Sequence, residues 1–373
     1  MSTIELSGVS KRFGASVALD GISLRVESGE TVAIIGASGA GKTVLLRLVA
    51  GVEDPSGGTI TIGGADMADV APERRGIGMA FQNFALFPHM TAFDNIASPL
   101  SARGASAGEV RRGVESVARM LKIESVLDHR PRALSNGQKQ RTALARALAA
   151  SPTILLLDDP LRNVDAKLRF EMRLEFERLL AEQGATTLYV TQDYREAMAL
   201  GHRIAVMDQG RLVQVGTPEE IYFEPAGIEV ARQFGDPTIN LVPAHPASDD
   251  RGAFATVGGA RLDLAPGADA VANGRECMVG IRPEALAFTE DAAGPFVVEA
   301  VTPLNEKVVT LVAGAEGTEL LVSRPSHEPT RRPGERVSLH VAAREVLLFA
   351  REDGARLSGA GAGAGAGAGS TPP

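Results

Sequence analysis

Residues 36–43 read GASGAGKT and fit the pattern G-x-x-x-x-G-K-[ST]. Glycines let a chain bend around an anion with its backbone N–H groups pointing inward. In such a loop Lys42 reaches the β- and γ-phosphates of a nucleotide, and the hydroxyl of Thr43 can bind Mg²⁺. A helix that begins here adds the positive end of its dipole. The stretch therefore predicts a phosphate-binding loop, with a glycine-rich turn that binds nothing as the alternative.

Two other chemistries fit this glycine-rich stretch less well. A dinucleotide-binding fingerprint that includes Gly39 and Gly41 would need a glycine at position 44, where the chain has Val44. A serine-hydrolase turn built on Ser38 would need a glycine two residues later, where the chain has Ala40.

Two adjacent aspartates end an apolar run in ILLLDDPLRNVD, residues 154–165. A strand over 154–157 that ends at Asp158 would place this carboxylate opposite Thr43, where it can hold Mg²⁺. Asp159 would then face the γ-phosphate and position a water molecule. The alternative is that both aspartates only cap the end of a strand.

The elements that must position these residues follow from the spacing of apolar side chains. We expect a strand over 31–36, a helix from Lys42 to Gly51, a helix over 107–122, a helix over 136–150 and a hairpin over 204–215. Short apolar runs that alternate with helical patterns predict an α/β domain with a largely parallel sheet over residues 1–235.

The pattern changes after Gly235-Asp236-Pro237. Short β-rich pieces separated by glycine and proline predict a small β-barrel domain over residues 236–352. Residues 353–373 are expected to be a disordered tail, because the run SGAGAGAGAGAGSTPP from residue 358 is of low complexity.

The bulk composition narrows the class of protein. A chain of 373 residues with a net charge of −8 is long enough for two domains, and its acidity argues against nucleic acid as a partner. A single cysteine, Cys277, excludes a disulfide framework and indicates a reducing compartment. We expect neither a signal peptide nor a membrane-spanning segment, because no apolar run reaches about 18 residues.

Together with the phosphate loop, the stretches LSNGQKQR (134–141) and LLLDDP (155–160) make the chain resemble the nucleotide-binding subunits of ATP-binding cassette (ABC) transporters. The resemblance covers residues 3–350. Within that family the chain is similar to the ATPases of carbohydrate importers of the maltose and glycerol-phosphate type. The narrower resemblance is carried by FQNFALFPHMT (81–91), DPLRNVDAKLR (159–169), GTPEEIY (216–222) and GIRPEAL (280–286).

The resemblance implies a P-loop NTPase domain with a helical subdomain over about 83–150, followed by a small domain similar to an oligonucleotide/oligosaccharide-binding (OB) barrel. It also implies ATP and Mg²⁺ as cofactors. Phe13 corresponds to an aromatic residue that stacks on adenine. The loop residues that would bind the nucleotide are Gly36, Ala37, Ser38, Gly39, Ala40, Gly41, Lys42, Thr43 and Val44. The metal positions are Thr43, Gln82 and Asp158, and the catalytic positions are Gln82, Asp159 and Gln192.

A second set of implied residues acts between subunits. Ser135, Gly137 and Gln138 belong to the family's signature sequence, which binds the nucleotide of a second subunit across a head-to-tail dimer. Asp165 corresponds to a residue of the loop that crosses this interface. The implied partners are two transmembrane permease subunits, a substrate-binding protein and a second ATPase subunit, identical or different. The implied location is peripheral, on the cytoplasmic face of the inner membrane. The implied function is to energise the import of a carbohydrate, polyol or related small solute.

Four positions depart from the family pattern. Asp159 stands where the family has a catalytic glutamate, and its carboxylate falls short by about 1 Å or more, which can cost about a hundredfold in rate. Gln192 replaces a histidine that contacts the γ-phosphate, and an amide can hydrogen-bond an oxygen but cannot take up a proton or carry a positive charge. Asn136 replaces a signature glycine. This change is mild if the position is left-handed, because asparagine tolerates a left-handed backbone better than other non-glycine residues. Arg162 stands where the family commonly has serine, and the resemblance implies that it adds a charge at the dimer-crossing loop.

These departures predict a subunit that binds ATP well and hydrolyses it poorly, so that it would work beside a more regular ATPase in a heterodimer. Three further functions stay open, namely a nucleotide-binding regulatory subunit, a soluble ABC protein of DNA repair or translation, and a small-molecule P-loop kinase. The β domain is expected to be regulatory or dimer-stabilising, because residues 238–350 hold 10 Lys/Arg against 15 Asp/Glu and no Tyr or Trp on which bases could stack.

Overall fold

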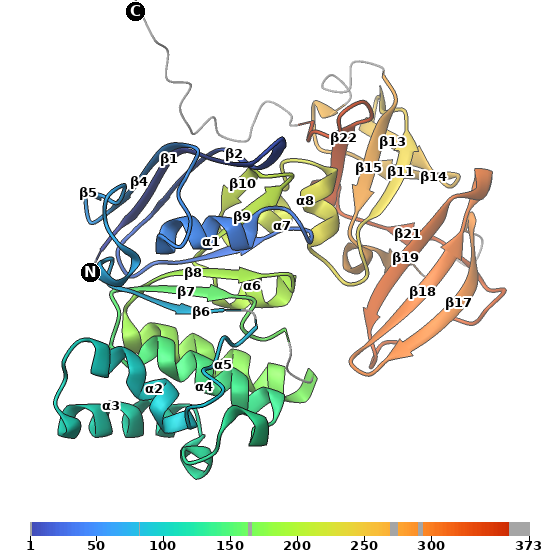
Figure 1. Cartoon of the computed structure of the whole chain (residues 1–373). Helices are drawn as coiled ribbons and strands as arrows, with labels where there is room; N and C mark the ends of the chain where they lie inside the picture. Colours follow the sequence, from blue (N-terminus) through green and yellow to red (C-terminus); the bar gives the residue numbers. More distant parts are fainter. Residues whose placement is uncertain (1, 82, 163–165, 269–274, 290–293, 358–373) are drawn as a thin grey trace, which may run out of the picture. The chain divides into compact units, whose positions relative to one another are not determined.

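The computed structural model describes residues 2–81, 83–162, 166–268, 275–289 and 294–357 (Figure 1). It divides into two compact units, residues 1–221 and residues 222–373. The domain boundary that the change of sequence pattern places at residues 235–236 lies beyond this division and stays a prediction.

A six-stranded sheet forms the centre of residues 1–221, in the order β10-β9-β3-β8-β7-β6. All neighbours are parallel except β9 and β10, which form an antiparallel hairpin. The strands are β3 (Thr31–Ile35), β6 (Ile77–Ala80), β7 (Ile154–Asp158), β8 (Thr186–Thr191), β9 (Arg203–Asp208) and β10 (Arg211–Gly216). Every residue of β3, β7 and β8 is buried, as expected of parallel strands covered on both faces. The predicted parallel sheet and its hairpin are confirmed.

The alternating side chains of β7 show how this sheet separates two cores. Ile154 and Leu156 pack in one cluster with α1 (Lys42–Ala50), whereas Leu155 and Leu157 pack in the other cluster with the helices of the opposite face. Figure 1 shows α1 on one side of β6, β7 and β8, and α2 to α5 on the other. Strand β7 and helix α1 therefore share one hydrophobic core.

A second, antiparallel sheet in the order β2-β1-β4-β5 covers the α1 side. Its strands are β1 (Ile4–Phe13), β2 (Ser16–Val26), β4 (Gly57–Ile62) and β5 (Ala65–Asp66). Ile4 and Leu6 are buried while Glu5 is exposed, which is the alternation of a half-buried strand. The sequence pattern does not predict this sheet, because bulges interrupt the alternation between Leu6 and Val9.

The opposite face carries a group of three helices, α2 (Ala92–Ala102), α3 (Ala107–Met120) and α4 (Asn136–Leu148). Each begins with a capping box, in which a hydroxyl side chain and the side chain three residues later exchange hydrogen bonds with the backbone. The capping pairs are Thr91 with Asp94, Ser106 with Glu109, and Ser135 with Gln138. The remaining helices are α5 (Ala166–Gln183), α6 (Tyr194–Leu200), α7 (Pro218–Phe223) and α8 (Ile228–Gln233).

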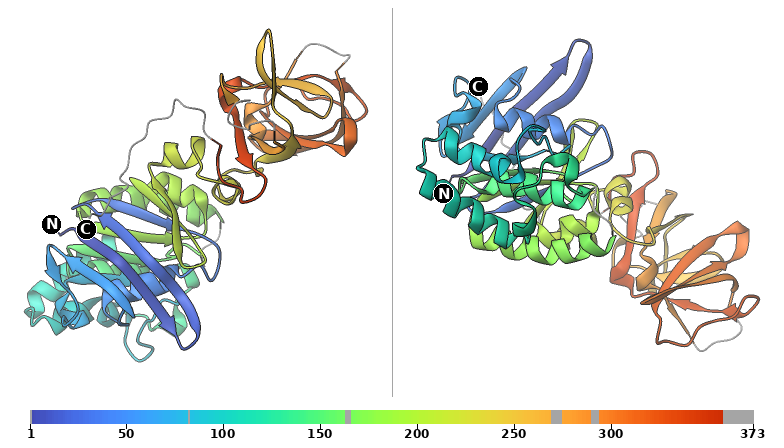
Figure 2. Two further views of the ribbon diagram at one scale, coloured as in Figure 1. Left: turned by 90° about the horizontal axis from the view of Figure 1, so that it is seen from above. Right: turned by 60° about the horizontal axis from the view of Figure 1, so that its bottom comes forward.

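The described part of residues 222–373 contains four small antiparallel sheets, β11-β15-β22, β12-β13-β14, β16-β21 and β19-β18-β17-β20. Their strands are β11 (Asn240–Ala244), β12 (Ala247–Asp249), β13 (Gly252–Val257), β14 (Ala260–Asp263), β15 (Cys277–Ile281), β16 (Ala287–Phe288), β17 (Phe296–Leu304), β18 (Lys307–Ala313), β19 (Glu319–Pro325), β20 (Arg336–Val337), β21 (Leu339–His340) and β22 (Val346–Ala350). Side chains from each of these four sheets, such as Val279, Leu262, Leu339 and Val298, share one core. Figure 2 shows these strands curved about a common interior, which confirms a small β-barrel-like unit.

The described chain beyond β22, up to Leu357, pairs with neighbouring backbone. The backbone N–H of Leu357 donates to the carbonyl of Leu348, and Ala355 bridges to Gly227. Residues 353–357, which were expected to be disordered, are therefore held by backbone pairing. The rest of the predicted tail, residues 358–373, lies outside the described residues. Within the described part of the chain, no helix has the length and apolar character that a membrane span requires.

Candidate active site

The loop over residues 36–43 joins β3 to α1, and two of its glycines are required by packing. A Cβ atom on Gly36 would lie 2.2 Å from the carbonyl oxygen of Met207, which is too close for any larger residue without a backbone shift. Gly41 caps the start of α1 with a φ of 96°, a left-handed conformation that glycine adopts without strain. The two glycines therefore let the loop pass close to β9 and turn into the first residue of α1.

Lys42 lies along the inside of this loop and is only 7% exposed. Its Nζ donates to the carbonyl oxygens of Gly36 at 2.6 Å and Ala37 at 2.8 Å. Burial lowers the pKa of Lys42, and the nearby carboxylates of Asp159 and Asp158 act in the opposite direction. The ammonium group is thus held at the loop by backbone oxygens and faces two carboxylates.

Thr43 and Asp158 link the start of α1 to the end of β7. The Thr43 hydroxyl donates to Oδ1 of Asp158 at 3.1 Å. Burial raises the pKa of Asp158, while the hydrogen bond from Thr43 and the positive charges of Arg47 and Lys42 lower it. A hydroxyl and a carboxylate side by side are the hard oxygen ligands that Mg²⁺ prefers, so these residues fit the metal.

Asp159 lies directly after β7 and is 7% exposed. Its φ of 50° is a left-handed conformation that aspartate tolerates better than most residues. Its N–H donates to the carbonyl of Val190 at 2.9 Å, which fixes the turn against β8. Burial raises the pKa of Asp159, Arg162 lowers it, and Asp158 raises it further. Oδ2 of Asp159 also lies 3.5 Å from Nη1 of Arg162.

These side chains line one cavity of about 210 Å³. Its lining consists of Ala18, Ser38, Gly39, Gly41, Lys42, Thr43, Val44, Asp158, Asp159, Arg162, Val190 and Gln192. The structure thus brings the loop, the two aspartates and Gln192 to one place. Sequence reasoning missed Ala18 and Val190, for which no chemical signal exists, and placed Arg162 at the dimer-crossing loop rather than in this cavity.

Other residues of the expected site lie outside the lining. Gly36, Ala37 and Ala40 belong to the loop but do not line the cavity, and neither does Phe13. Phe13 is 48% exposed at the end of β1, and Nζ of Lys11 lies 4.9 Å from its ring centroid. Gln82 and Asp165 lie outside the described residues.

The signature residues form the start of α4 and also lie outside this cavity. The Ser135 hydroxyl accepts from the N–H of Gln138 at 3.3 Å, and Oε1 of Gln138 accepts from the N–H of Ser135 at 2.9 Å. Gly137 lies in the first turn of the helix. Asn136 is the first residue of α4 and does not have a positive φ. The expectation that Asn136 substitutes for glycine in a left-handed conformation is therefore wrong, because this position is helical.

Comparison with known proteins decides the family. A family model described as ABC transporter matches residues 19–162, a MalK OB fold domain model matches residues 235–286, and a TOBE domain model matches residues 279–349. The sn-glycerol-3-phosphate import ATP-binding protein UgpC of Escherichia coli (strain K12) is 39% identical over 360 residues, covering 96% of this chain and 100% of that protein. The chain belongs to the ATP-binding subunits of ABC transporters.

Further relatives agree with this membership. UgpC of Yersinia pseudotuberculosis serotype I (strain IP32953) is 38% identical over 364 residues, covering 96% of this ABC subunit and 99% of that protein. Among solved structures, the ATP-binding cassette MJ0796 bound to ADP and Pi, a dimeric post-hydrolysis state, is 33% identical with a TM-score of 0.54. That match covers 58% of this chain and 98% of MJ0796. The protein is thus an ABC-type ATPase that binds ATP and carries OB-fold and TOBE domains after its ATPase domain.

Proposed function

We propose that this ABC ATPase energises an importer for a carbohydrate, polyol or related small solute. The observation that carries the proposal is the cavity in which the phosphate loop, Lys42 and the Thr43–Asp158 pair meet, in a chain that matches import ATP-binding proteins over their full length. The MalK OB fold model supports the carbohydrate class of solute.

Most of the residues that would hold the nucleotide line the cavity, whereas Phe13 and Gln82 are taken from the family resemblance. Backbone N–H groups of the loop and the ammonium of Lys42 would bind the phosphates, and Phe13 would lie against the adenine. Thr43 and Asp158, with Gln82, would hold Mg²⁺. When bound, this ion neutralises part of the negative charge of the phosphates. Asp159 would orient the attacking water, because its carboxylate lies in the same cavity as Lys42 and Thr43.

Hydrolysis in this site is expected to be slow. The Asp159 carboxylate is one methylene shorter than a glutamate, and Arg162 lies 3.5 Å from it. Gln192 lines the cavity but has no charge to offer the γ-phosphate. These observations favour a second candidate function, in which the subunit binds ATP, hydrolyses it weakly and works in a heterodimer with a regular ATPase. Ser135, Gly137 and Gln138 would then complete the partner's site.

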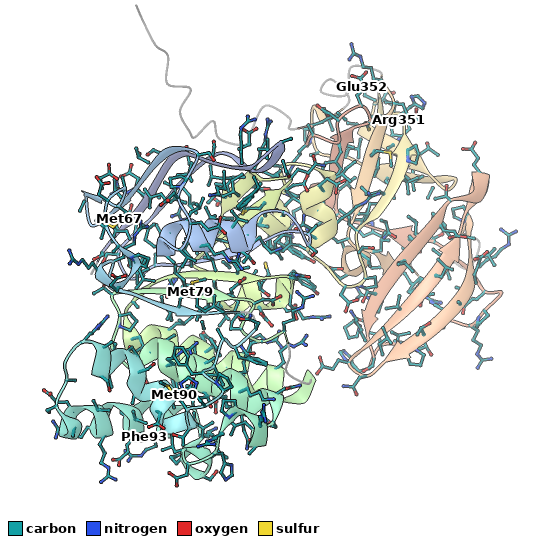
Figure 3. The ribbon with its side chains drawn as sticks, viewed as in Figure 1. Met67, Met79, Met90, Phe93, Arg351 and Glu352 are labelled. Carbon is teal, nitrogen blue, oxygen red and sulfur yellow. The ribbon has the colours of Figure 1, made fainter. Side chains whose placement is uncertain are left out.

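A groove between β6 and the ends of α2 and α4 is a fitting place for the permease subunits. It has a volume of about 620 Å³ and a largely apolar lining that includes Met79, Phe81, Phe87 and Pro99. Figure 3 labels Met79 on β6, next to the helical layer. We expect a permease segment to dock here, where Phe81 lines the groove. This docking would hold the subunit at the cytoplasmic face of the inner membrane. A substrate-binding protein would be a further partner in the assembled importer.

Single-turnover ATP hydrolysis by the purified full chain tests the proposal. The double variant Asp159→Glu/Gln192→His should hydrolyse Mg·ATP at least about tenfold faster than the natural sequence, because the carboxylate gains reach and an imidazole that can take up a proton replaces the neutral amide. Asp69→Glu, an exposed site, is the matched control and should change nothing. A natural chain that already hydrolyses as fast as the double variant would contradict slow turnover and the heterodimer candidate.

A further inference from the structure

Arg162 is a second cationic side chain in the phosphate cavity. The charged residues of the lining are Lys42, Arg162, Asp158 and Asp159. Lys42 is already held by two carbonyl oxygens of its own loop. Gln192 also lines the cavity, but its side chain is a neutral amide and adds no positive charge. Arg162 is therefore the side chain that can bring additional positive charge to a bound triphosphate.

The backbone of Arg162 is fixed while its side chain keeps freedom. Its N–H donates to the carbonyl of Asp159 at 3.2 Å, and its carbonyl accepts from Nη2 of Arg169 at 3.4 Å. Leu161, the preceding residue, is fully buried and anchors the turn. The Arg162 side chain is 47% exposed, so the guanidinium can move without unfolding the loop.

The partner of this guanidinium is the residue that faces the reaction. Nη1 of Arg162 lies 3.5 Å from Oδ2 of Asp159, which is an ion pair without a short hydrogen bond. A second hollow of about 300 Å³ adjoins the pair and is lined by Asp159, Arg162 and Gln192 among others. The guanidinium can thus hold the carboxylate and still present its remaining N–H groups to a phosphate oxygen, since arginine has five donors.

We propose that Arg162 binds the γ-phosphate and makes this site discriminate ATP from ADP, in place of the charge that Gln192 lacks. This inference rests on the proposed function, because it assumes that the cavity binds Mg·ATP. Arginine suits the task because its planar guanidinium binds phosphate through two parallel hydrogen bonds, and arginines that act on a γ-phosphate also occur in other phosphoryl-transfer sites. Asp159 serves as the positioning residue that keeps the guanidinium at the cavity.

A different role for the same pair makes the opposite prediction. If Arg162 only locked Asp159, its removal would free the carboxylate and accelerate hydrolysis without changing the relative affinities for ATP and ADP. The two roles therefore differ in a binding measurement that does not depend on turnover.

The test is calorimetric titration of the full chain with Mg·ATP and, separately, with Mg·ADP. Arg162→Ser should weaken Mg·ATP binding about tenfold and leave Mg·ADP binding within about twofold, because only ATP carries the γ-phosphate. Arg162→Lys, which keeps the charge but loses the paired hydrogen bonds, should give an intermediate loss for ATP. Arg111→Ser, on the exposed face of α3, is the matched control and should leave both affinities unchanged.

Three outcomes would overturn the inference. Equal weakening of both nucleotides by Arg162→Ser would indicate general electrostatics, and unchanged affinity for both would remove Arg162 from the site. Faster hydrolysis with an unchanged ratio of affinities would establish the lock instead. Failure of the natural chain to bind either nucleotide would overturn the proposed function itself, and this result is distinct from the other three.

Discussion

The hydroxyl of Thr43 donates to Oδ1 of Asp158 across 3.1 Å and so joins the first turn of α1 to the last residue of β7. The two residues lie 115 positions apart in the chain. Their contact brings the loop that would bind the phosphates together with the carboxylate that would hold the metal. The pair therefore marks the point at which nucleotide and metal would meet.

Replacing the Thr43 hydroxyl should reduce the dependence of ATP binding on Mg²⁺. Thr43→Ala removes one oxygen ligand and leaves Asp158 without its hydrogen-bond donor. In the natural chain we expect Mg²⁺ to increase the affinity for ATP. In Thr43→Ala this increase should be smaller by about tenfold or more, because an interaction of a polar group with a charged one contributes about 1.5–3 kcal/mol. Titration with ATP in the presence of Mg²⁺ and in the presence of EDTA measures this. Thr43→Ser keeps the hydroxyl and should keep the effect, and an equal loss in both variants would argue against a metal role.

The glycine at position 36 is expected to be indispensable for the loop. In Gly36→Ala the new methyl group would meet the carbonyl of Met207 at 2.2 Å, so the backbone has to shift. Overpacking of this kind costs about 1–3 kcal/mol, which lowers the melting temperature by about 5 °C and displaces the loop. Thermal unfolding and ATP titration should both show the loss.

Gly57→Ala is the control for this substitution, because an added Cβ there has no neighbour within 4 Å. It should leave the melting temperature within about 1 °C, given that exposed substitutions rarely change stability by more than about 0.5 kcal/mol. Unchanged stability of Gly36→Ala would show that the close approach to Met207 is not enforced.

The ionised side chain of Asp159 should make the fold less stable at neutral pH than the uncharged asparagine of an Asp159→Asn variant. Burial raises the pKa of this carboxyl, although Arg162 opposes the effect. Because the folded-state pKa lies above the unfolded value, the ionised form destabilises the fold at higher pH, and the penalty disappears once the pH falls below the unfolded value of about 4. Asp159→Asn should therefore raise the urea midpoint at pH 7.5, and the difference should vanish near pH 4.

Glu30 provides a control of opposite sign. Burial raises the pKa of Glu30, but the hydrogen bonds from Arg203 and the backbone prevail, so the pKa is lowered overall. Its carboxylate accepts from Nε of Arg203 at 2.6 Å. Glu30→Gln should lower the urea midpoint at pH 7.5, and this difference should shrink as the pH falls through the folded-state pKa. Identical pH profiles for the two variants would show that burial does not govern Asp159.

Arg146 is expected to hold the segment that borders the docking groove. Its guanidinium donates to the carbonyls of Ala85 at 2.7 Å and Phe84 at 3.1 Å, and both of these residues have a positive φ. Arg146→Ala should release the segment, so amide hydrogen exchange over residues 84–87 should accelerate by about tenfold or more, as a local opening that loses two hydrogen bonds would. Co-purification with a permease should weaken in parallel. Arg111→Ala should leave exchange in this segment unchanged, and equal exchange in both variants would contradict the role of Arg146.

Local signals were sufficient to predict much of this fold. The helix α1 begins at Lys42 and is capped by Gly51, as the sequence indicates, and α3 lies within the predicted range 107–122, with Val110, Val114 and Val117 on its buried face. These elements depend on residues close in sequence. The bulged strand β1 could not be predicted in the same way, because its pairing with β2 and β4 depends on distant partners.

The chemistry of the cavity was predictable in type but not in detail. The residue types around Lys42 and Asp158 follow from their spacing. The contact between Arg162 and Asp159 does not, because it depends on the left-handed turn at Asp159 and on the buried Leu161, which only the folded chain defines. The pairing of residues 353–357 with β22 likewise could not be seen in a stretch whose composition indicates disorder.

Equilibrium titration of the purified full chain with ATP, with and without Mg²⁺, tests the nucleotide site most directly when Lys42→Ala is measured beside it. We predict that the natural chain binds ATP far more tightly with Mg²⁺ than without it, and that Lys42→Ala loses most of this affinity while it remains folded. A natural chain without Mg²⁺-dependent affinity for ATP, or a folded Lys42→Ala variant that binds equally well, would contradict a nucleotide site in this cavity.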